Sequence, residues 1–169
     1  MRFKIELSYN GTDYHGWQIQ PNAVTVQQII EDAFSILLRE KIEIVGCGRT
    51  DTGVHAKYFV AHFDYHTEIE ISSFLKKVNS FLPKDIFISN IAIVNSDFHA
   101  RFSAVSRTYK YNIITQKDPF NNAYSWGVFS NINIDKMNEA ANMLLGYTDF
   151  TSFSKLHTDV ITNNCKIKY

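Results

Sequence analysis

Apolar and polar residues alternate from the start of the chain. In residues 3–9, FKIELSY, every second side chain is apolar, which is typical of a strand buried on one face. Residues 41–46, 57–65 and 85–94 are also rich in β-branched and aromatic residues and are bounded by turn residues. We therefore expect four strands in the first hundred residues or so.

Two helical patterns separate these strands. Thr25, with Gln28 three residues later, forms a capping-box signature, and a helically spaced apolar stripe runs on to about Arg39. A second stripe begins at Ser72 and ends at Pro83, which cannot continue a helix. The predicted order βαββαβ is that of the ferredoxin-like fold, the frame of RNA-recognition modules, with an antiparallel sheet and helices on one face. The expected fold class is α+β.

A second unit follows. We expect an N-terminal ferredoxin-like domain over residues 1–102 and a partial second α/β domain over residues 103–169. Its predicted elements are fewer than those of the first domain, so we expect this second domain to be incomplete. These elements are strand-like segments at 107–115 and 125–130, a helix from Ile134 to Leu145 and a last strand at 165–169.

Composition narrows the class of protein. The chain has 169 residues, 45% of them hydrophobic, which suits a globular protein with a core. No apolar run approaches the roughly 20 residues that a membrane span needs, and the alternating N-terminus is unlike a signal peptide. Cys47 and Cys165 lack the spacing of a zinc motif or a disulfide framework, so we expect a reducing cytoplasm. Charge is balanced, with 17 basic and 17 acidic residues, which does not by itself indicate nucleic-acid binding.

The segment GCGRTDTGVHA, residues 46–56, is unusually polar and holds three glycines. We expect these glycines to allow positive φ angles and the close approach of another molecule. Arg49 and Asp51 are two residues apart and can form a charge-assisted pair that favours the ionised carboxylate. A carboxylate placed in this way can act as a base or a nucleophile. A turn with a surface salt bridge explains the same residue types equally well.

Two further segments extend the pattern, YNGTDYHGWQ at 9–18 and FHARFSAVSRTYKY at 98–111. Together with GRTDTGVHA, these two segments resemble three segments of the TruA family of tRNA pseudouridine synthases, in the same order. The nine-residue match of GRTDTGVHA is the most specific of the three. The resemblance covers nearly the whole chain, although a family segment of M-V-R type has no counterpart before Tyr169. It implies an isomerase that converts uridine to pseudouridine at positions 38–40 of the tRNA anticodon arm. It also implies a homodimer that needs no metal or organic cofactor.

The resemblance assigns roles to three residues. Asp51 would be the catalytic carboxylate, Arg49 would pair with it and help displace the target nucleotide, and Tyr109 would stack on the flipped uracil. Because the base is detached at N1 and rejoined through C5, it must leave its stack to be reached. The residues leave open whether Asp51 attacks C1′ or C6 or acts as a base.

Other aromatic and basic residues are candidate RNA contacts, foremost Tyr14, Arg101, Arg107 and Lys110. Each has a structural alternative. Tyr14 and Trp17 can pack in the core, where we place Trp17, and we also expect Phe102 to be buried. Arg101 and Lys110 can instead form a solvated edge. For His55 we expect a hydrogen bond that holds the loop rather than a catalytic role.

Two rival functions belong to other classes. The first is metal-dependent hydrolysis, but His62 and His66 are four apart on a predicted strand, about 13 Å, so they do not form a helical pair of ligands. The second is an RNA-binding module without chemistry, for which a Gly-Arg-Thr-Asp loop is more than simple binding needs. The expected partner is tRNA, with no membrane association.

Overall fold

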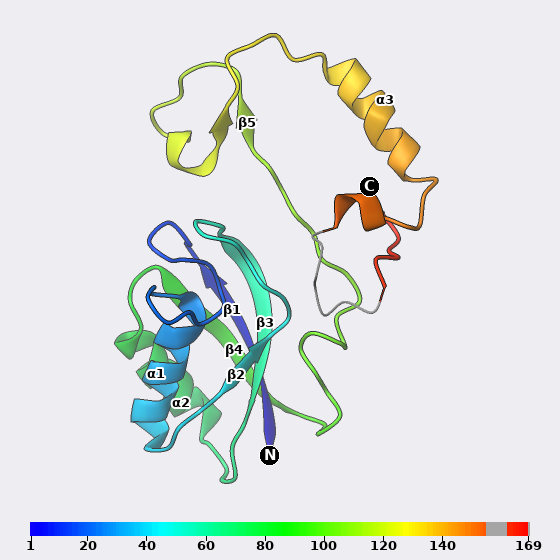
Figure 1. Cartoon of the computed structure of the whole chain (residues 1–169). Helices are drawn as coiled ribbons and strands as arrows, with labels where there is room; N and C mark the ends of the chain where they lie inside the picture. The colour runs from blue at the N-terminus through cyan, green and yellow to red at the C-terminus, as the bar shows by residue number, and fades with distance from the viewer. Residues whose placement is uncertain (155–161, 169) are drawn as a thin grey trace. The chain divides into compact units, whose positions relative to one another are not determined.

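The computed structural model describes residues 1–154 and 162–168, which belong to two compact units, Met1–Arg107 and Thr108–Tyr169. The first has the predicted order βαββαβ (Figure 1). Its elements are β1 (Arg2–Tyr9), α1 (Val26–Leu38), β2 (Ile44–Gly46), β3 (Ala56–Asp64), α2 (Ile71–Phe81) and β4 (Ile86–Val94).

The four strands form one antiparallel sheet in the order β2-β3-β1-β4. The first strand is central, so that Ile5 lies opposite Ala61 of β3 on one side and Ile91 of β4 on the other. Helices α1 and α2 cover the same face of this sheet (Figure 1). The α+β, ferredoxin-like fold predicted from the sequence is confirmed.

The core lies between the sheet and the two helices. Alternation in β1 buries Phe3, Ile5, Leu7 and Tyr9, while the intervening residues face the side of the sheet without helices. Phe34 of α1 packs its ring edge-on against Phe63 of β3 and Phe74 of α2, at 5.1 Å between ring centroids in each case. The predicted cap of α1 is formed, because the Thr25 side chain accepts a hydrogen bond from the Gln28 nitrogen at 3.4 Å.

In the second unit the described elements are shorter than predicted. They are β5 (Ile113–Ile114), a 3-10 turn (Asn122–Tyr124), β6 (Trp126–Gly127), α3 (Ile134–Leu144) and a second 3-10 turn (Thr151–Phe153). The strands β5 and β6 pair in parallel over two residues each, so the predicted segments 107–115 and 125–130 do pair, but only over these short stretches.

The predicted last strand at 165–169 is not found in its described residues, 165–168, and Tyr169 lies outside them. An isolated bridge joins Asp149 and Asn164 instead, beside a backbone hydrogen bond from Cys165 to Thr148 at 2.9 Å. Alternation alone cannot form a strand, because a strand needs a neighbour and a core to cover. No side chain among the described residues of this unit is buried.

The helices of the described residues are too short or too polar for a bilayer: none has the length and apolar character of a membrane span.

Candidate functional site

The conspicuous polar segment of the sequence forms a loop between β2 and β3, here called the GRTD loop (residues 47–55). It packs against the β1–α1 loop (residues 10–25). Three hydrogen bonds join the two loops, so that each holds the other in place. The backbone nitrogen of Trp17 donates to the carbonyl of Thr50 at 3.1 Å, that of Gly53 to the carbonyl of Tyr14 at 3.2 Å, and that of Gly11 to Nδ1 of His55 at 3.0 Å.

The bond at His55 confirms its predicted role in holding the loop. Its Nδ1 accepts a hydrogen bond, which requires that this ring nitrogen carry no proton. The partner, Gly11, lies two residues after the end of β1 and is buried. His55 therefore ties the end of the GRTD loop to the chain where it leaves the sheet.

Three buried aromatic residues form a cluster next to the GRTD loop: Tyr9, Trp17 and Phe59. The Trp17 and Phe59 rings are 4.2 Å apart between centroids, and those of Tyr9 and Phe59 are 5.8 Å apart. The hydroxyl oxygens of Tyr9 and Thr50 lie 2.9 Å apart and share a hydrogen bond. Trp17 is a core residue, as predicted. The cluster holds Thr50, the residue before Asp51, through both its side chain and its carbonyl group.

Two glycines of this region, Gly16 and Gly46, leave room for other parts of the same protein. Gly16 has a φ of +83°, and a Cβ atom there would lie 2.2 Å from the carbonyl oxygen of Thr50. At Gly46 a Cβ would lie 2.6 Å from the Trp17 ring, so this glycine admits a side chain of the same molecule. Of Gly46, Gly48 and Gly53, only the last has a positive φ, +78°. The predicted approach of another molecule thus finds open space only at Gly53, where an added Cβ would meet no atom within 4 Å.

Asp51 and Arg49 are both exposed on the GRTD loop. The predicted ion pair between them is not formed: within residues 1–154 and 162–168, the ion pairs involve other side chains. Water solvates both charges at such a position, and an exposed pair is worth only about 0–1 kcal/mol, which does not offset the loss of side-chain freedom. The backbone on the far side of Asp51 is held by a turn, in which Val54 N donates to the Asp51 carbonyl at 3.2 Å.

Arg107 was expected to contact RNA, yet its guanidinium group binds backbone carbonyls. Its Nη2 and Nε donate to the carbonyl of Cys47 at 2.7 and 3.2 Å, and Nη2 also donates to the carbonyl of Arg101 at 3.1 Å. Arg101 itself is exposed, with its guanidinium carbon 5.8 Å from the Phe102 ring centroid. Phe102 is 77% exposed, so its predicted burial is wrong: its ring lies on the surface beside that of His99.

Tyr14 is a core residue here rather than a free surface for RNA. The residue is 5% exposed, and its hydroxyl donates to Oδ1 of Asp85 at 2.7 Å. Burial, and then the bond to Asp85, raise the pKa of the Tyr14 phenol, which remains a neutral donor. The predicted RNA contact at Tyr14 is therefore corrected to a structural link between the β1–α1 loop and the start of β4. Sequence alone did not separate these roles, because an aromatic residue in a loop suits either.

Tyr109, Lys110 and Tyr111 belong to the second unit and are exposed. Tyr109 and Tyr111 are 67% and 83% exposed, so neither ring is buried in a core. The role of Tyr109 toward Asp51 stays a prediction.

The metal-site alternative, considered for His62 and His66, finds no support among the described residues. Among the described residues, no group of three or more His, Cys, Asp or Glu side chains is arranged to hold a metal ion. His62 is buried, and its Nδ1 accepts a hydrogen bond from the Ala100 nitrogen at 3.2 Å. Burial, followed by the charges of Arg2 and His99, lowers the pKa of His62. The metal hydrolase alternative thus lacks a ligand set in this part of the chain.

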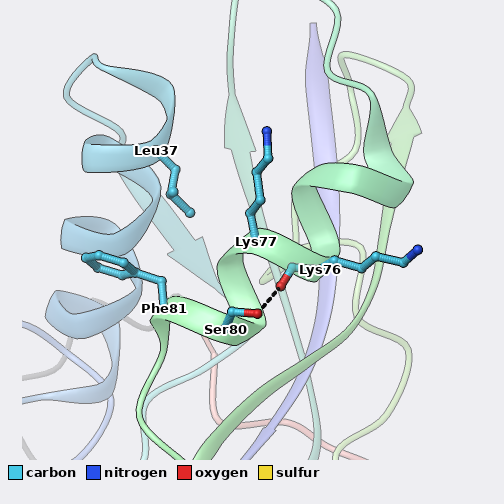
Figure 2. A pocket seen from close by; sticks show the side chains of 5 residues that line it. All are labelled: Leu37, Lys76, Lys77, Ser80 and Phe81. Carbon is cyan, nitrogen blue, oxygen red and sulfur yellow. Dashed lines mark hydrogen bonds between the residues drawn. The ribbon is translucent and has the colours of Figure 1, made fainter.

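One shallow hollow lies away from the GRTD loop, on the helical side of the sheet. Figure 2 shows Leu37 of α1 and Phe81 of α2 at its sides, with Lys76, Lys77 and Ser80 completing its lining. The Ser80 hydroxyl donates a hydrogen bond to the Lys76 carbonyl at 2.9 Å, which is a contact within helix α2. None of the predicted site residues lines this hollow.

The sequence alone did not identify all of the residues that hold the GRTD loop and the neighbouring β1–α1 loop in place. The alternation in residues 3–9 predicts only that Tyr9 is buried, and no sequence pattern distinguishes Asp85. The role of Tyr9 could have been inferred from its position as the last apolar residue of a predicted buried strand face, because a buried tyrosine hydroxyl usually finds a hydrogen-bond partner.

Together, these features define an α+β protein that presents an exposed aspartate on a firmly anchored loop of a ferredoxin-like sheet. Residues 7–103 match the family described as tRNA pseudouridine synthase, a range that holds both loops and Asp51. The chain belongs to this family.

Bacterial relatives named tRNA pseudouridine synthase A are similar along nearly all of the chain. The one from Bacteroides fragilis is 51% identical, over 99% of this chain and 67% of its own length. The one from Parabacteroides distasonis is 53% identical over the same shares. A relative from Thermoanaerobacter sp. is 42% identical, over 88% of this chain and 62% of its own length. The chain thus spans about two thirds of the length of these relatives.

Proposed function

We propose that this chain acts as a tRNA pseudouridine synthase, an isomerase that converts uridine to pseudouridine in the anticodon arm, at positions 38–40. The observation that carries the proposal is the exposed Asp51 on a loop anchored at Thr50, within the segment that matches the family. The names of the relatives support the same activity.

The chemistry requires one carboxylate and no net oxidation. The N1–C1′ bond breaks, the uracil turns, and a C5–C1′ bond forms; the proton on C5 is lost and N1 gains one. Asp51 serves either as the nucleophile, at C1′ or C6, or as the base that removes a proton. Atoms and electrons balance on each route without a metal or organic cofactor.

Access to the uridine requires base flipping. In this proposal Tyr109 stacks on the flipped base, which is worth roughly 1–3 kcal/mol, and Arg49 helps to displace it. The exposed Arg101 and Lys110 contact phosphates, which makes binding dependent on salt. The protein works as a homodimer in the cytoplasm, to which its free thiols Cys47 and Cys165 are suited.

The test is tritium release from tRNA that carries [5-³H]uridine. The chain should release tritium in proportion to the uridines at positions 38–40, and chemical mapping of pseudouridine should locate the product there. Release should persist in EDTA when the tRNA remains folded. Binding of tRNA without any release would instead identify a non-catalytic RNA-binding module.

A further inference from the structure

The segment that leaves β4 crosses the sheet on the face without helices, and three side chains hold it in turn. Arg2 of β1 donates through Nη1 to the carbonyls of Ser96 and Phe98, at 2.7 and 2.8 Å. The same guanidinium binds both oxygens of Asp64, at 2.9 and 2.7 Å. Since β1 lies beside β4, the first anchor is one strand away from the start of the segment.

The second anchor is His62 of β3, which accepts the hydrogen bond from Ala100. The strand order β2-β3-β1-β4 means that the segment has now passed β1 and lies at β3, next to β2. The third anchor is Arg107, whose side chain binds the carbonyl of Cys47, the residue that follows β2. The segment therefore ends at the first residue of the GRTD loop.

The Cys47 peptide is held from both sides. Its nitrogen donates to the carbonyl of Val60 on β3 at 2.8 Å, and its carbonyl accepts two N–H groups of Arg107. A planar guanidinium presents donors in a fixed fork, so two bonds to one oxygen and a third to Arg101 set its orientation. Asp51 follows Cys47 by four residues, and Thr50 in between is held by the aromatic cluster.

We propose that Arg107 is a positioning residue for the GRTD loop and not an RNA contact. By fixing the Cys47 peptide it sets where the loop begins, and thereby where Asp51 is presented. Tyr109 follows Arg107 by two residues, so one side chain joins the loop of the predicted catalytic carboxylate to the segment that leads to the predicted stacking ring. The effect on catalysis rests on the proposed function; the anchoring of the loop does not.

Three variants separate positioning from phosphate binding. Arg107→Gln removes the charge and the fork. Arg107→Lys keeps the charge, but its side chain is shorter and has no Nε–Nη2 fork. Lys110→Gln is the matched control, because it removes one exposed positive charge close by in the chain. Each folded variant is measured for hydrogen exchange over the GRTD loop, for tRNA binding at several salt concentrations, and for single-turnover tritium release.

If Arg107 positions the loop, both of its variants should raise exchange at the backbone amides of the GRTD loop. Turnover should fall by about 10- to 100-fold, the range expected from displacing a catalytic group by up to 1 Å. The tRNA affinity and its salt slope should stay as in the unchanged chain, whereas Lys110→Gln should lower the salt slope and leave exchange unaltered.

The proposal is overturned if Arg107→Gln leaves hydrogen exchange at the GRTD loop unchanged. It is also overturned if Arg107→Lys has full turnover while Arg107→Gln lowers the tRNA affinity and the salt slope as Lys110→Gln does. A chain without tritium release would refute the proposed function, and the exchange measurement would still decide whether Arg107 holds the loop.

Discussion

The hydroxyl groups of Tyr9 and Thr50, 2.9 Å apart, join the last buried residue of β1 to the residue that precedes Asp51. The two side chains come from positions 41 apart in the sequence. Through this bond the central strand of the sheet supports the residue next to the exposed Asp51. A loop held in this way keeps its geometry before any RNA binds, which is the condition for a positioned catalytic group.

Tyr9→Phe tests this link, because it removes the hydroxyl and keeps the ring in its cluster. We expect the free energy of unfolding to fall by about 0.5–1.5 kcal/mol, the net worth of a typical hydrogen bond, as measured by urea unfolding. In a double-mutant cycle, Thr50→Val should add little to Tyr9→Phe. Tyr65→Phe is the control, since its hydroxyl makes a long bond of 3.5 Å to Leu38 away from the loop. Fully additive effects of Tyr9→Phe and Thr50→Val would contradict the link.

Gly16→Ala should destabilise the protein strongly. The positive φ of this residue disfavours any L side chain by roughly 1–2 kcal/mol, and the new Cβ would also collide with the Thr50 carbonyl. Gly48→Ala is the matched control, because its Cβ would make only an ordinary contact of 3.5 Å with Nε of Arg107. Equal melting temperatures for the two variants would show that the contact between the two loops is not needed for folding.

Tyr109→Phe should retain tRNA affinity, whereas Tyr109→Ala should lose affinity or turnover, since the ring supplies the stacking. Filter binding and single-turnover tritium release on the same preparations separate the two effects. Equal losses of affinity in both variants would exclude a stacking role, and a loss of turnover in the Phe variant alone would indicate proton transfer by the hydroxyl.

The pH dependence of stability should report His62. Because burial and the nearby Arg2 and His99 lower the pKa of this imidazole, the unfolded chain binds the proton more readily than the folded one. Stability is therefore fully present above the unfolded pKa of about 6.5 and falls as the pH drops below it, levelling off below the folded pKa. The carboxylate of Asp64 does not add to this slope: Arg2 lowers its pKa in the folded state, so it titrates in more acidic solution.

His62→Asn should flatten that dependence between pH 7 and 5. An Asn oxygen can accept the hydrogen bond from Ala100 in place of Nδ1, and it does not titrate in this range. Urea unfolding across the pH range measures the slope for both proteins. An unchanged slope in the variant would assign the dependence to another group.

The strands and helices of the first unit were predictable because each buries one face. In β1 the alternation from Phe3 to Tyr9 leaves a single register that buries the apolar set, and the stripe of α1 around Ile30 and Phe34 has one possible inner side. In the second unit the same kind of pattern predicted too much strand, because alternation does not specify a partner.

The loops were harder to predict, since their contacts join residues distant in sequence. Spacing suggested a pair between Arg49 and Asp51, yet these charges stay exposed and the loop is held by Tyr9, Trp17 and His55. As a basic residue among aromatic ones, Arg107 was a candidate RNA contact. Only the fold shows that its guanidinium donates hydrogen bonds to the Cys47 carbonyl. The motif indicated the GRTD loop as the candidate site, while the fold was needed to show which residues hold this loop in place.

The most direct test of the account is single-turnover tritium release by Asp51→Asn, with tRNA binding measured on the same folded preparation. The amide keeps the size of the side chain but cannot act as a nucleophile or base at neutral pH. Because Asp51 is exposed and makes no ion pair with Arg49, folding should be nearly unaffected. We expect no measurable release, with tRNA affinity unchanged within a few-fold. Release at the rate of the unchanged chain would contradict the assignment of Asp51 as the catalytic carboxylate.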